Sequence, residues 1–193
     1  MKTEIIYGFH PVMEALKAGK RNFSEVCIGR EKTVPRAKEV AGLCKKKDVP
    51  LRYISTAQLN SMTGAAEHQG IGARVGPLPL LSLKELFTEK IKVPFLVLLD
   101  HIVDPHNLGA IMRTALGVGA DGIVIGKDRS ASPTASVSRV SAGAMEHLPV
   151  AQVVNLANAI KLLKKMNVWV AGLDMSAEDT LYTKDMTGPL ALV

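Results

Sequence analysis

The chain has 193 residues, of which 47% are hydrophobic and 22% are charged, and its formal net charge is +6. This length and composition allow one or two folded domains with a buried core and argue against a disordered chain. No apolar run approaches the roughly 20 residues needed to span a bilayer, and the first residues lack the apolar core of a signal peptide. We therefore expect a cytoplasmic protein that does not enter membranes. The positive charge favours a polyanionic partner such as RNA without proving one.

Cysteine and histidine usage gives no sign of a metal site. Cys27 and Cys44 have no CxxC partner, and the five histidines do not show the spacing of zinc ligands. We therefore expect buried, reduced thiols and no bound metal. Aromatic residues make up only 4% of the chain, so phosphate contacts and shape would dominate any binding of RNA.

The first 75 residues alternate helix and strand signals and predict a small α/β module. Gly19 is expected to end the first helix, and Thr56 is a plausible N-cap for the third. The predicted elements are helices at 11–18 and 35–47, a short helix after Thr56, and strands at 25–28, 51–54 and 71–75.

Residues 76–92 are predicted to form a linker, because Gly76-Pro77-Leu78-Pro79 interrupts this pattern. Within the linker, Ser82 and Glu85 resemble a capping box and predict a helix that continues to about Ile91.

Residues 93–193 alternate strands and helices again. We predict strands at 95–99, 122–125, 149–154, 168–172 and 189–193, and helices at 107–118, 133–140 and 156–166. Such alternation is typical of parallel strands joined by right-handed crossovers. The predicted fold class is therefore α/β, with a small domain at 1–75 and a parallel-sheet domain at 93–193.

The stretch from Phe95 to Gly126 is the most informative part of the chain. An apolar strand leads into a polar loop and then into a helix that carries Asn107, Gly109 and Arg113 near its start. Ligands collect outside the carboxyl ends of strands in parallel sheets, so these residues lie where chemistry usually occurs. Simpler interpretations stay open, because Asn107 is also a favoured N-cap and Arg113 could be an ordinary exposed helix residue.

Asn107-x-Gly109-x-x-x-Arg113 after such a strand resembles the first motif of the SpoU (TrmH-like) RNA ribose 2′-O-methyltransferases. The loop at 126–131 and the segment at 141–149, which includes Ser141-Ala142-Gly143-Ala144 and Glu146, are similar to other parts of that family. The start of the chain at 7–12 and His68-Gln69-Gly70-Ile71 resemble the RNA-binding domain of the RlmB-like branch, which methylates guanosine in 23S ribosomal RNA.

This resemblance implies methyl transfer from S-adenosylmethionine to a ribose 2′-OH of RNA. It also implies a SPOUT-type domain with a trefoil knot, and a homodimer whose active site lies near the subunit interface. The family has two further motifs after a strand like the one at 189–193. We therefore expect that the chain is C-terminally incomplete and that most of the knot region is missing.

The resemblance also suggests roles for individual residues. Arg113, Asn107 and Glu146 are the catalytic candidates, and Gly172 and Leu173 are the candidate contacts to the cofactor. A guanidinium is a poor base, so Arg113 is better suited to bind a phosphate and orient the 2′-OH. The candidate RNA contacts are Lys127, Arg129, Ser130, Arg139, Arg21 and Arg30, with Ser138 and Ser141 as candidates to extend that surface.

Three alternatives stay open at this point. The first is a methyltransferase of the same class that acts on transfer RNA, although the N-terminal module and the His68–Gly70 segment favour ribosomal RNA. The second is a non-catalytic RNA-binding protein. The third is a nucleotide-binding α/β enzyme, which the absence of a P-loop or dinucleotide fingerprint argues against.

Overall fold

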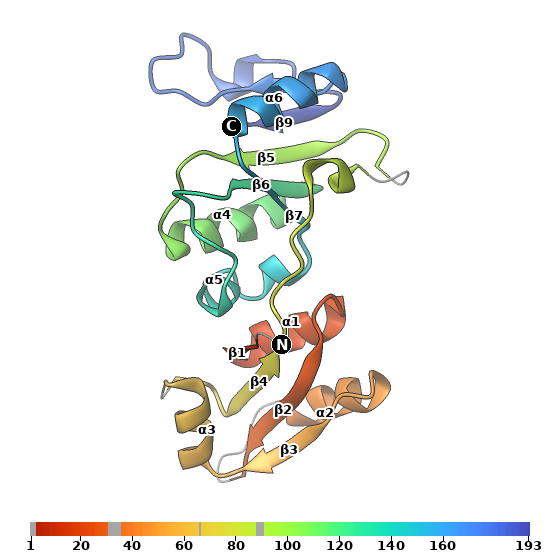
Figure 1. Cartoon of the computed structure of the whole chain (residues 1–193), viewed down its shortest axis with the longest axis vertical. Coiled ribbons are helices and arrows are strands. Elements are labelled where there is room, and N and C mark those ends of the chain that lie inside the picture. The colour runs from red at the N-terminus through yellow and green to blue at the C-terminus, as the bar shows by residue number, and fades with distance from the viewer. Residues whose placement is uncertain (1–2, 31–35, 66, 88–90) are drawn as a thin grey trace. The chain divides into compact units, whose positions relative to one another are not determined.

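A computed structural model of the chain describes residues 3–30, 36–65, 67–87 and 91–193 (Figure 1). Its contacts form two compact units, which are described separately. Unit 1 contains residues 1–79, 105–113 and 132–147, and unit 2 contains residues 80–104, 114–131 and 148–193. Two later segments, 105–113 and 132–147, therefore belong to unit 1 together with the first part of the chain.

Unit 1 is built on a four-stranded sheet in the order β1-β4-β2-β3. β4 is antiparallel to both of its neighbours, whereas β2 and β3 are parallel. The predicted strand at 71–75 is present and is an inner strand of this sheet. β1 is absent from the predicted elements, and its pairing with β4 explains why it forms. The strands are β1 (Glu4–Tyr7), β2 (Phe23–Gly29), β3 (Leu51–Ile54) and β4 (Ile71–Val75).

Three helices pack with this sheet: α1 (Phe9–Ala18), α2 (Ala37–Lys46) and α3 (Thr56–Thr63). Gly19 ends α1 in the left-handed conformation, as predicted. Ser55, and not Thr56, is the N-cap of α3, because Ser55 and Gln58 form a reciprocal capping box. Pro35, the predicted start of the second helix, lies outside the described residues. The core includes Ile6, Val12, Leu16, Val26, Ile28, Val40, Ile71 and Val75.

Two later segments complete unit 1. They are the first part of α4 (Pro105–Gly117), and the region that contains α5 (Ala135–Val140) and the short 3-10 helix η2 (Ala144–Glu146). Gly109 of α4 lies directly against the end of α5, since a Cβ at this position would be 2.8 Å from Val140 Cβ and 3.1 Å from the Ser141 nitrogen. Gly109 therefore allows the end of α5 to lie close to the backbone of α4.

Unit 2 is built on a five-stranded parallel sheet in the order β7-β6-β5-β9-β8, which confirms the predicted parallel sheet. Asn155 caps the helix α6 (Leu156–Lys165) by accepting a hydrogen bond from the Asn158 nitrogen. The strands are β5 (Phe95–Leu99), β6 (Gly122–Gly126), β7 (Val150–Val153), β8 (Trp169–Ala171) and β9 (Leu190–Leu192). Buried residues of its core include Leu96, Leu98, Val124, Ala151, Leu163 and Ala191.

The predicted capping box between Ser82 and Glu85 is present, but the helix that it opens is short. It is a 3-10 helix, η1 (Leu83–Leu86), and Phe87 already has an extended backbone. Residues 88–90 of the predicted helix lie outside the described residues. Within the described part of the chain, no helix has both the length and the apolar character required to cross a bilayer.

Replacing Gly109 with alanine should destabilise the protein by up to about 2 kcal/mol, because overpacking against Val140 costs about 1–3 kcal/mol and the gain in helix propensity offsets about 1 kcal/mol of that cost. Gly117→Ala is a matched control in the same helix, because a Cβ there would meet no atom within 4 Å. It should be neutral or slightly stabilising. Chemical denaturation measures both variants, and equal effects would contradict the close packing of α4 on α5.

Candidate functional site

Asn107 and Arg113 are both exposed on α4. The helix begins at Pro105, a residue that suits the first helical position. Asn107 therefore lies in the first turn and is not the N-cap that the sequence suggested. Arg113 is six positions further along the helix, so the two side chains leave the helix about 120° apart and do not share a face. Arg113 instead lies one turn after Gly109, the residue that packs on α5.

Glu146 and Arg21 form a buried ion pair in unit 1. Both side chains are 0% exposed, and Arg21 Nε donates to Glu146 Oε2 at 2.7 Å. Arg21 Nη2 donates to Glu146 Oε1 at 3.1 Å, which makes the contact bidentate. This burial corrects two expectations. Arg21 was expected to contact RNA and Glu146 to take part in catalysis, but a side chain with no exposed surface contacts neither RNA nor a reacting group in this structure.

The ion pair belongs to a larger buried network. Ser138 donates to Glu146 Oε1 at 2.7 Å. Arg21 Nη1 pairs with Glu4, whose other oxygen accepts a hydrogen bond from the Ala135 nitrogen at 3.1 Å. Ser138 and Ser141 are both buried, so they do not extend an RNA-binding surface as expected. Their hydroxyls instead hold α5 and the turn after it.

A second polar contact joins α1 to the residue after η2. Glu14 Oε2 lies 2.7 Å from His147 Nε2, and Lys20 donates to the His147 carbonyl at 2.6 Å. Burial lowers the pKa of Lys20, and the charge of Glu146 opposes that shift. Gly143 is also required here, because it has φ +84° and its Cβ would lie 2.7 Å from Glu14 Cβ.

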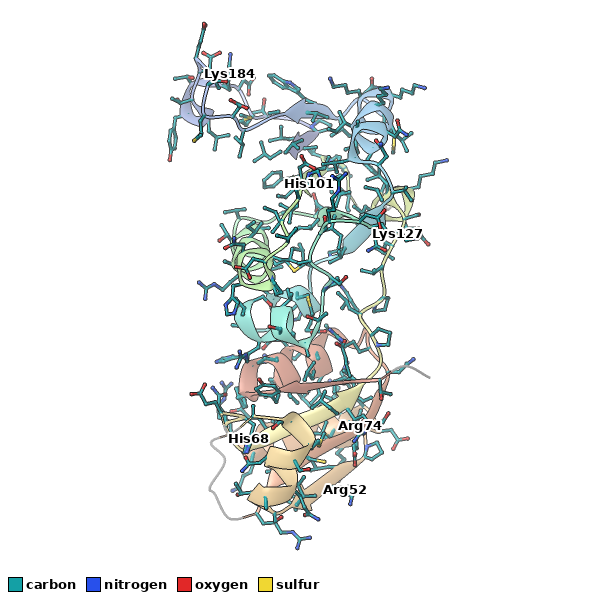
Figure 2. The ribbon with its side chains drawn as sticks, turned by 60° about the vertical axis from the view of Figure 1, so that its left-hand side comes forward. Arg52, His68, Arg74, His101, Lys127 and Lys184 are labelled. Atoms are coloured by element: carbon teal, nitrogen blue, oxygen red, sulfur yellow. The ribbon has the colours of Figure 1, made fainter. Side chains whose placement is uncertain are left out.

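In unit 2, the loop after β6 lies at the carboxyl end of the sheet. Asp128, Arg129 and Ser130 of this loop line a cavity of about 400 Å³. His101, which follows β5, and residues that follow β7 and β9 complete its lining. Arg129 and His101 both have left-handed backbones, with φ of 51° and 53°. Lys127 is exposed in the same loop; Lys127 and His101 are both labelled in Figure 2. The loop therefore presents cations where ligands of parallel sheets usually bind.

Gly172 and Leu173 follow β8 and line a second cavity in unit 2, of about 590 Å³. Nothing lies within 4 Å of a Cβ placed on Gly172, and Leu173 is exposed. The cavity wall combines apolar side chains with carboxylates: Trp169, Leu173, Met175, Leu181, Asp174 and Asp179. Its volume falls in the usual range of small-molecule sites.

Arg139 and Arg30 are exposed in unit 1. The Arg139 guanidinium lies over the Tyr7 ring, 5.5 Å from its centre, and Arg30 Nε donates to the Tyr53 carbonyl at 2.8 Å. Both keep surface that RNA could contact. Among the described residues, no cluster of three or more His, Cys, Asp or Glu could hold a metal ion.

Two family models match the chain. Residues 5–81 match the family described as RNA 2′-O ribose methyltransferase substrate binding. Residues 94–193, just over half of the chain, match the SpoU rRNA methylase family. The chain belongs to the SpoU rRNA methylase family. This confirms the resemblance that the sequence motifs indicated.

Curated relatives agree with this SpoU assignment. A putative TrmH family tRNA/rRNA methyltransferase, YacO of Bacillus subtilis, is 38% identical over 193 residues, covering 98% of this chain and 77% of that protein. The 23S rRNA (guanosine-2′-O-)-methyltransferase RlmB of Escherichia coli K12 is 36% identical, covering 99% of this chain and 79% of the relative.

Solved structures share the SpoU fold. An AdoMet-bound rRNA methyltransferase from Sinorhizobium meliloti has a TM-score of 0.77 at 20% identity, covering 98% of this chain and 69% of that one. The SpoU methyltransferase AviRb from Streptomyces viridochromogenes, in complex with AdoMet, has a TM-score of 0.78 at 20% identity, covering 98% of this chain and 71% of AviRb. These likenesses confirm the predicted fold class.

The sequence motifs of this SpoU protein did not reveal the Arg21–Glu146 pair. Each residue was singled out, but for a separate role, and the two are 125 positions apart in the sequence. No periodicity or spacing rule connects residues at such a separation. The only available signal was chemical: an acidic residue at the end of an otherwise small and apolar segment needs a partner if it is buried.

Glu14 should stabilise the fold in a pH-dependent way. Burial raises its pKa, but hydrogen bonds and charges from Lys17 and His147 outweigh burial, so its pKa lies below the ordinary 4.5. The carboxylate therefore contributes stability above pH 4.5, and this contribution is lost as pH falls through the lowered pKa. Urea denaturation of Glu14→Gln and wild type should show a difference at pH 7 that shrinks towards pH 3. A pH-independent difference would contradict this.

Proposed function

We propose that this SpoU protein transfers the methyl group of S-adenosylmethionine to the 2′-OH of a guanosine in 23S ribosomal RNA. The observation that carries the proposal is the match of residues 94–193 to the SpoU rRNA methylase family. Relatives named as 23S rRNA guanosine-2′-O-methyltransferases, aligned over 99% of the chain, support this substrate. The Bacillus subtilis relative is named for both tRNA and rRNA, so transfer RNA is the second candidate substrate.

The cavity after β8 fits a nucleoside-sized cofactor. Gly172 leaves space for a ligand against the backbone, and Leu173 and Met175 offer apolar surface for an adenine ring. Asp174 and Asp179 offer carboxylates that can accept hydrogen bonds from ribose hydroxyls. S-adenosylmethionine, when bound, supplies a methyl group that its sulfonium already activates. The protein then has to align the hydroxyl with that methyl group and help to remove a proton.

Arg113 is the proposed residue that orients the RNA. Its exposed guanidinium on α4 can bind a phosphate in a bidentate way and so direct the neighbouring 2′-OH. Because a free guanidinium is a poor base, proton removal would pass through phosphate or water. Asn107, exposed six positions earlier on another face of α4, is proposed as a further hydrogen-bonding contact to RNA.

The remaining RNA contacts are proposed on both units. Lys127, Arg129 and Ser130 present two cations and a hydroxyl after β6, and such groups suit phosphates. Arg139 and Arg30 are the exposed candidates in unit 1. The domain at 1–75 is proposed to bind the RNA substrate, because it lies within the match at residues 5–81.

Family membership also supports three further parts of the proposal. The methyltransferase domain would contain a trefoil knot, and two copies would form a homodimer with active sites near the interface. A protein that modifies bacterial ribosomal RNA would act in the cytoplasm. Sedimentation of the purified protein tests the dimer, and a monomer at micromolar concentration would contradict it.

The function is tested by incubating the full chain with methyl-labelled S-adenosylmethionine and unmodified transcripts of 23S ribosomal RNA or transfer RNA. We expect label in 23S RNA, recovered as 2′-O-methylguanosine after digestion. Label in transfer RNA alone would support the second substrate. RNA binding without any transfer would contradict the enzyme and favour a non-catalytic RNA-binding protein.

Arg113→Ala should reduce methyl transfer by about 100-fold or more, because misplacing the hydroxyl slows the reaction steeply. The melting temperature should change by no more than about 2 °C, since surface substitutions have small effects on stability. Lys161→Ala, which removes an exposed cation from α6, is the control and should keep full activity. Wild-type turnover by Arg113→Ala would exclude the proposed role.

Arg129→Asn tests the loop after β6. Asparagine tolerates the left-handed backbone of Arg129, so this change removes the charge without adding strain. If Arg129 contacts a phosphate, RNA affinity should fall and the slope of log affinity against log salt should decrease by about one. Lys161→Ala again serves as the control. An unchanged slope would mean that Arg129 makes no phosphate contact.

A further inference from the structure

A continuous path of contacts within unit 1 connects the turn between α1 and β2 to the helix that carries Arg113. The path starts at Arg21 in that turn and passes to Glu146 at the end of η2. Glu146 accepts a hydrogen bond from Ser138 of α5 at 2.7 Å. The end of α5 packs on Gly109 of α4, one turn before Arg113.

In the first step of this path, the contact between Arg21 and Glu146, every nitrogen of the Arg21 guanidinium has a hydrogen-bond partner. Nε and Nη2 of Arg21 bind the two oxygens of Glu146, and Nη1 binds Glu4 and the Gly76 carbonyl, the latter at 3.1 Å. Glu146 therefore accepts three hydrogen bonds inside the protein. A bidentate guanidinium fixes the plane of the carboxylate as well as its position, so Arg21 determines where Glu146 and its neighbours lie.

The later steps leave little freedom for the segment between α5 and η2. The Ala135 nitrogen at the start of α5 donates to Glu4, and Gly143 allows no larger residue against Glu14. At the end of α5, Val140 would be only 2.8 Å from a Cβ at position 109. Close-packed contacts of this kind transmit displacement, because they cannot compress. A shift of Glu146 therefore moves the surface on which α4 rests.

We propose that Arg21 is a positioning residue for methyl transfer. It acts through Glu146 and α5 to hold the turn of α4 that carries Arg113. This inference rests on the proposed function and deepens it: the small N-terminal domain supplies part of the framework of the reaction site, in addition to binding RNA. Arg21 does not touch the substrate, because its side chain has no exposed surface.

Arg21→Lys is the main test, because lysine keeps the positive charge but lacks the bidentate fork. Arg52→Lys is the matched control. Arg52, labelled in Figure 2, also pairs with a glutamate of the same domain, Glu25 at 3.0 Å, but its side chain is 64% exposed. A second test variant, Arg21→Met combined with Glu146→Leu, replaces the ion pair with apolar groups and avoids an unpaired buried charge.

Kinetics separate positioning from RNA binding. For Arg21→Lys and the double variant, kcat should fall by about 10- to 100-fold, while KM for RNA and for S-adenosylmethionine stays within about twofold. Arg52→Lys should match wild type in kcat and in both KM values. A raised KM for RNA with unchanged kcat would mean that Arg21 contacts RNA instead, and unchanged kinetics would overturn the proposal.

Hydrogen exchange provides a second readout that needs no activity. Amides of residues 105–113 should exchange several-fold faster in both Arg21 variants than in wild type or Arg52→Lys. Unchanged exchange there would overturn the positioning role even if the enzyme is active. If wild type transfers no methyl to RNA, the proposed function fails, and the exchange result still decides whether Arg21 holds α4.

Discussion

The buried pair of Arg21 and Glu146 is the constraint on which unit 1 depends. Charges without water are tolerated in a protein only when partners satisfy them with good geometry. Here all three guanidinium nitrogens and both carboxylate oxygens have partners. Glu4, Ser138 and the Gly76 carbonyl must therefore keep their places as well. These contacts connect the sheet of the small domain to the segment from α5 to η2.

This constraint gives a physical reason for the small residues of Ser141-Ala142-Gly143-Ala144. The segment turns sharply against α1, where Gly143 adopts φ +84° and any Cβ would collide with Glu14. Gly109 likewise allows α4 to lie close to the end of α5. The two family models match consecutive stretches of the chain, 5–81 and 94–193. The contacts divide the chain differently, because residues 105–113 and 132–147 belong to unit 1.

Local signals predicted much of this fold. The five strands of the parallel sheet, the end of α1 at Gly19 and the capping box at Ser82 are all present, because each has a sequence signal within a few residues: an apolar run, a glycine, or a Ser–Glu pair. β1 was missed because its four residues depend on pairing with β4, far along the chain. Arg21 and Glu146 were given exposed roles because sequence shows charge but not burial. The alternative interpretation of Asn107 as an N-cap was wrong, because α4 already begins at Pro105.

A double-mutant cycle between Arg21 and Glu146 tests the central claim most directly. The free energy of unfolding is measured for wild type, Arg21→Met, Glu146→Leu and the combined variant. If the pair holds unit 1 together, each single change leaves a buried charge alone and the coupling energy should be about 2–3 kcal/mol. A coupling energy near zero would contradict the claim, because it would mean that the two side chains do not depend on each other in the folded protein.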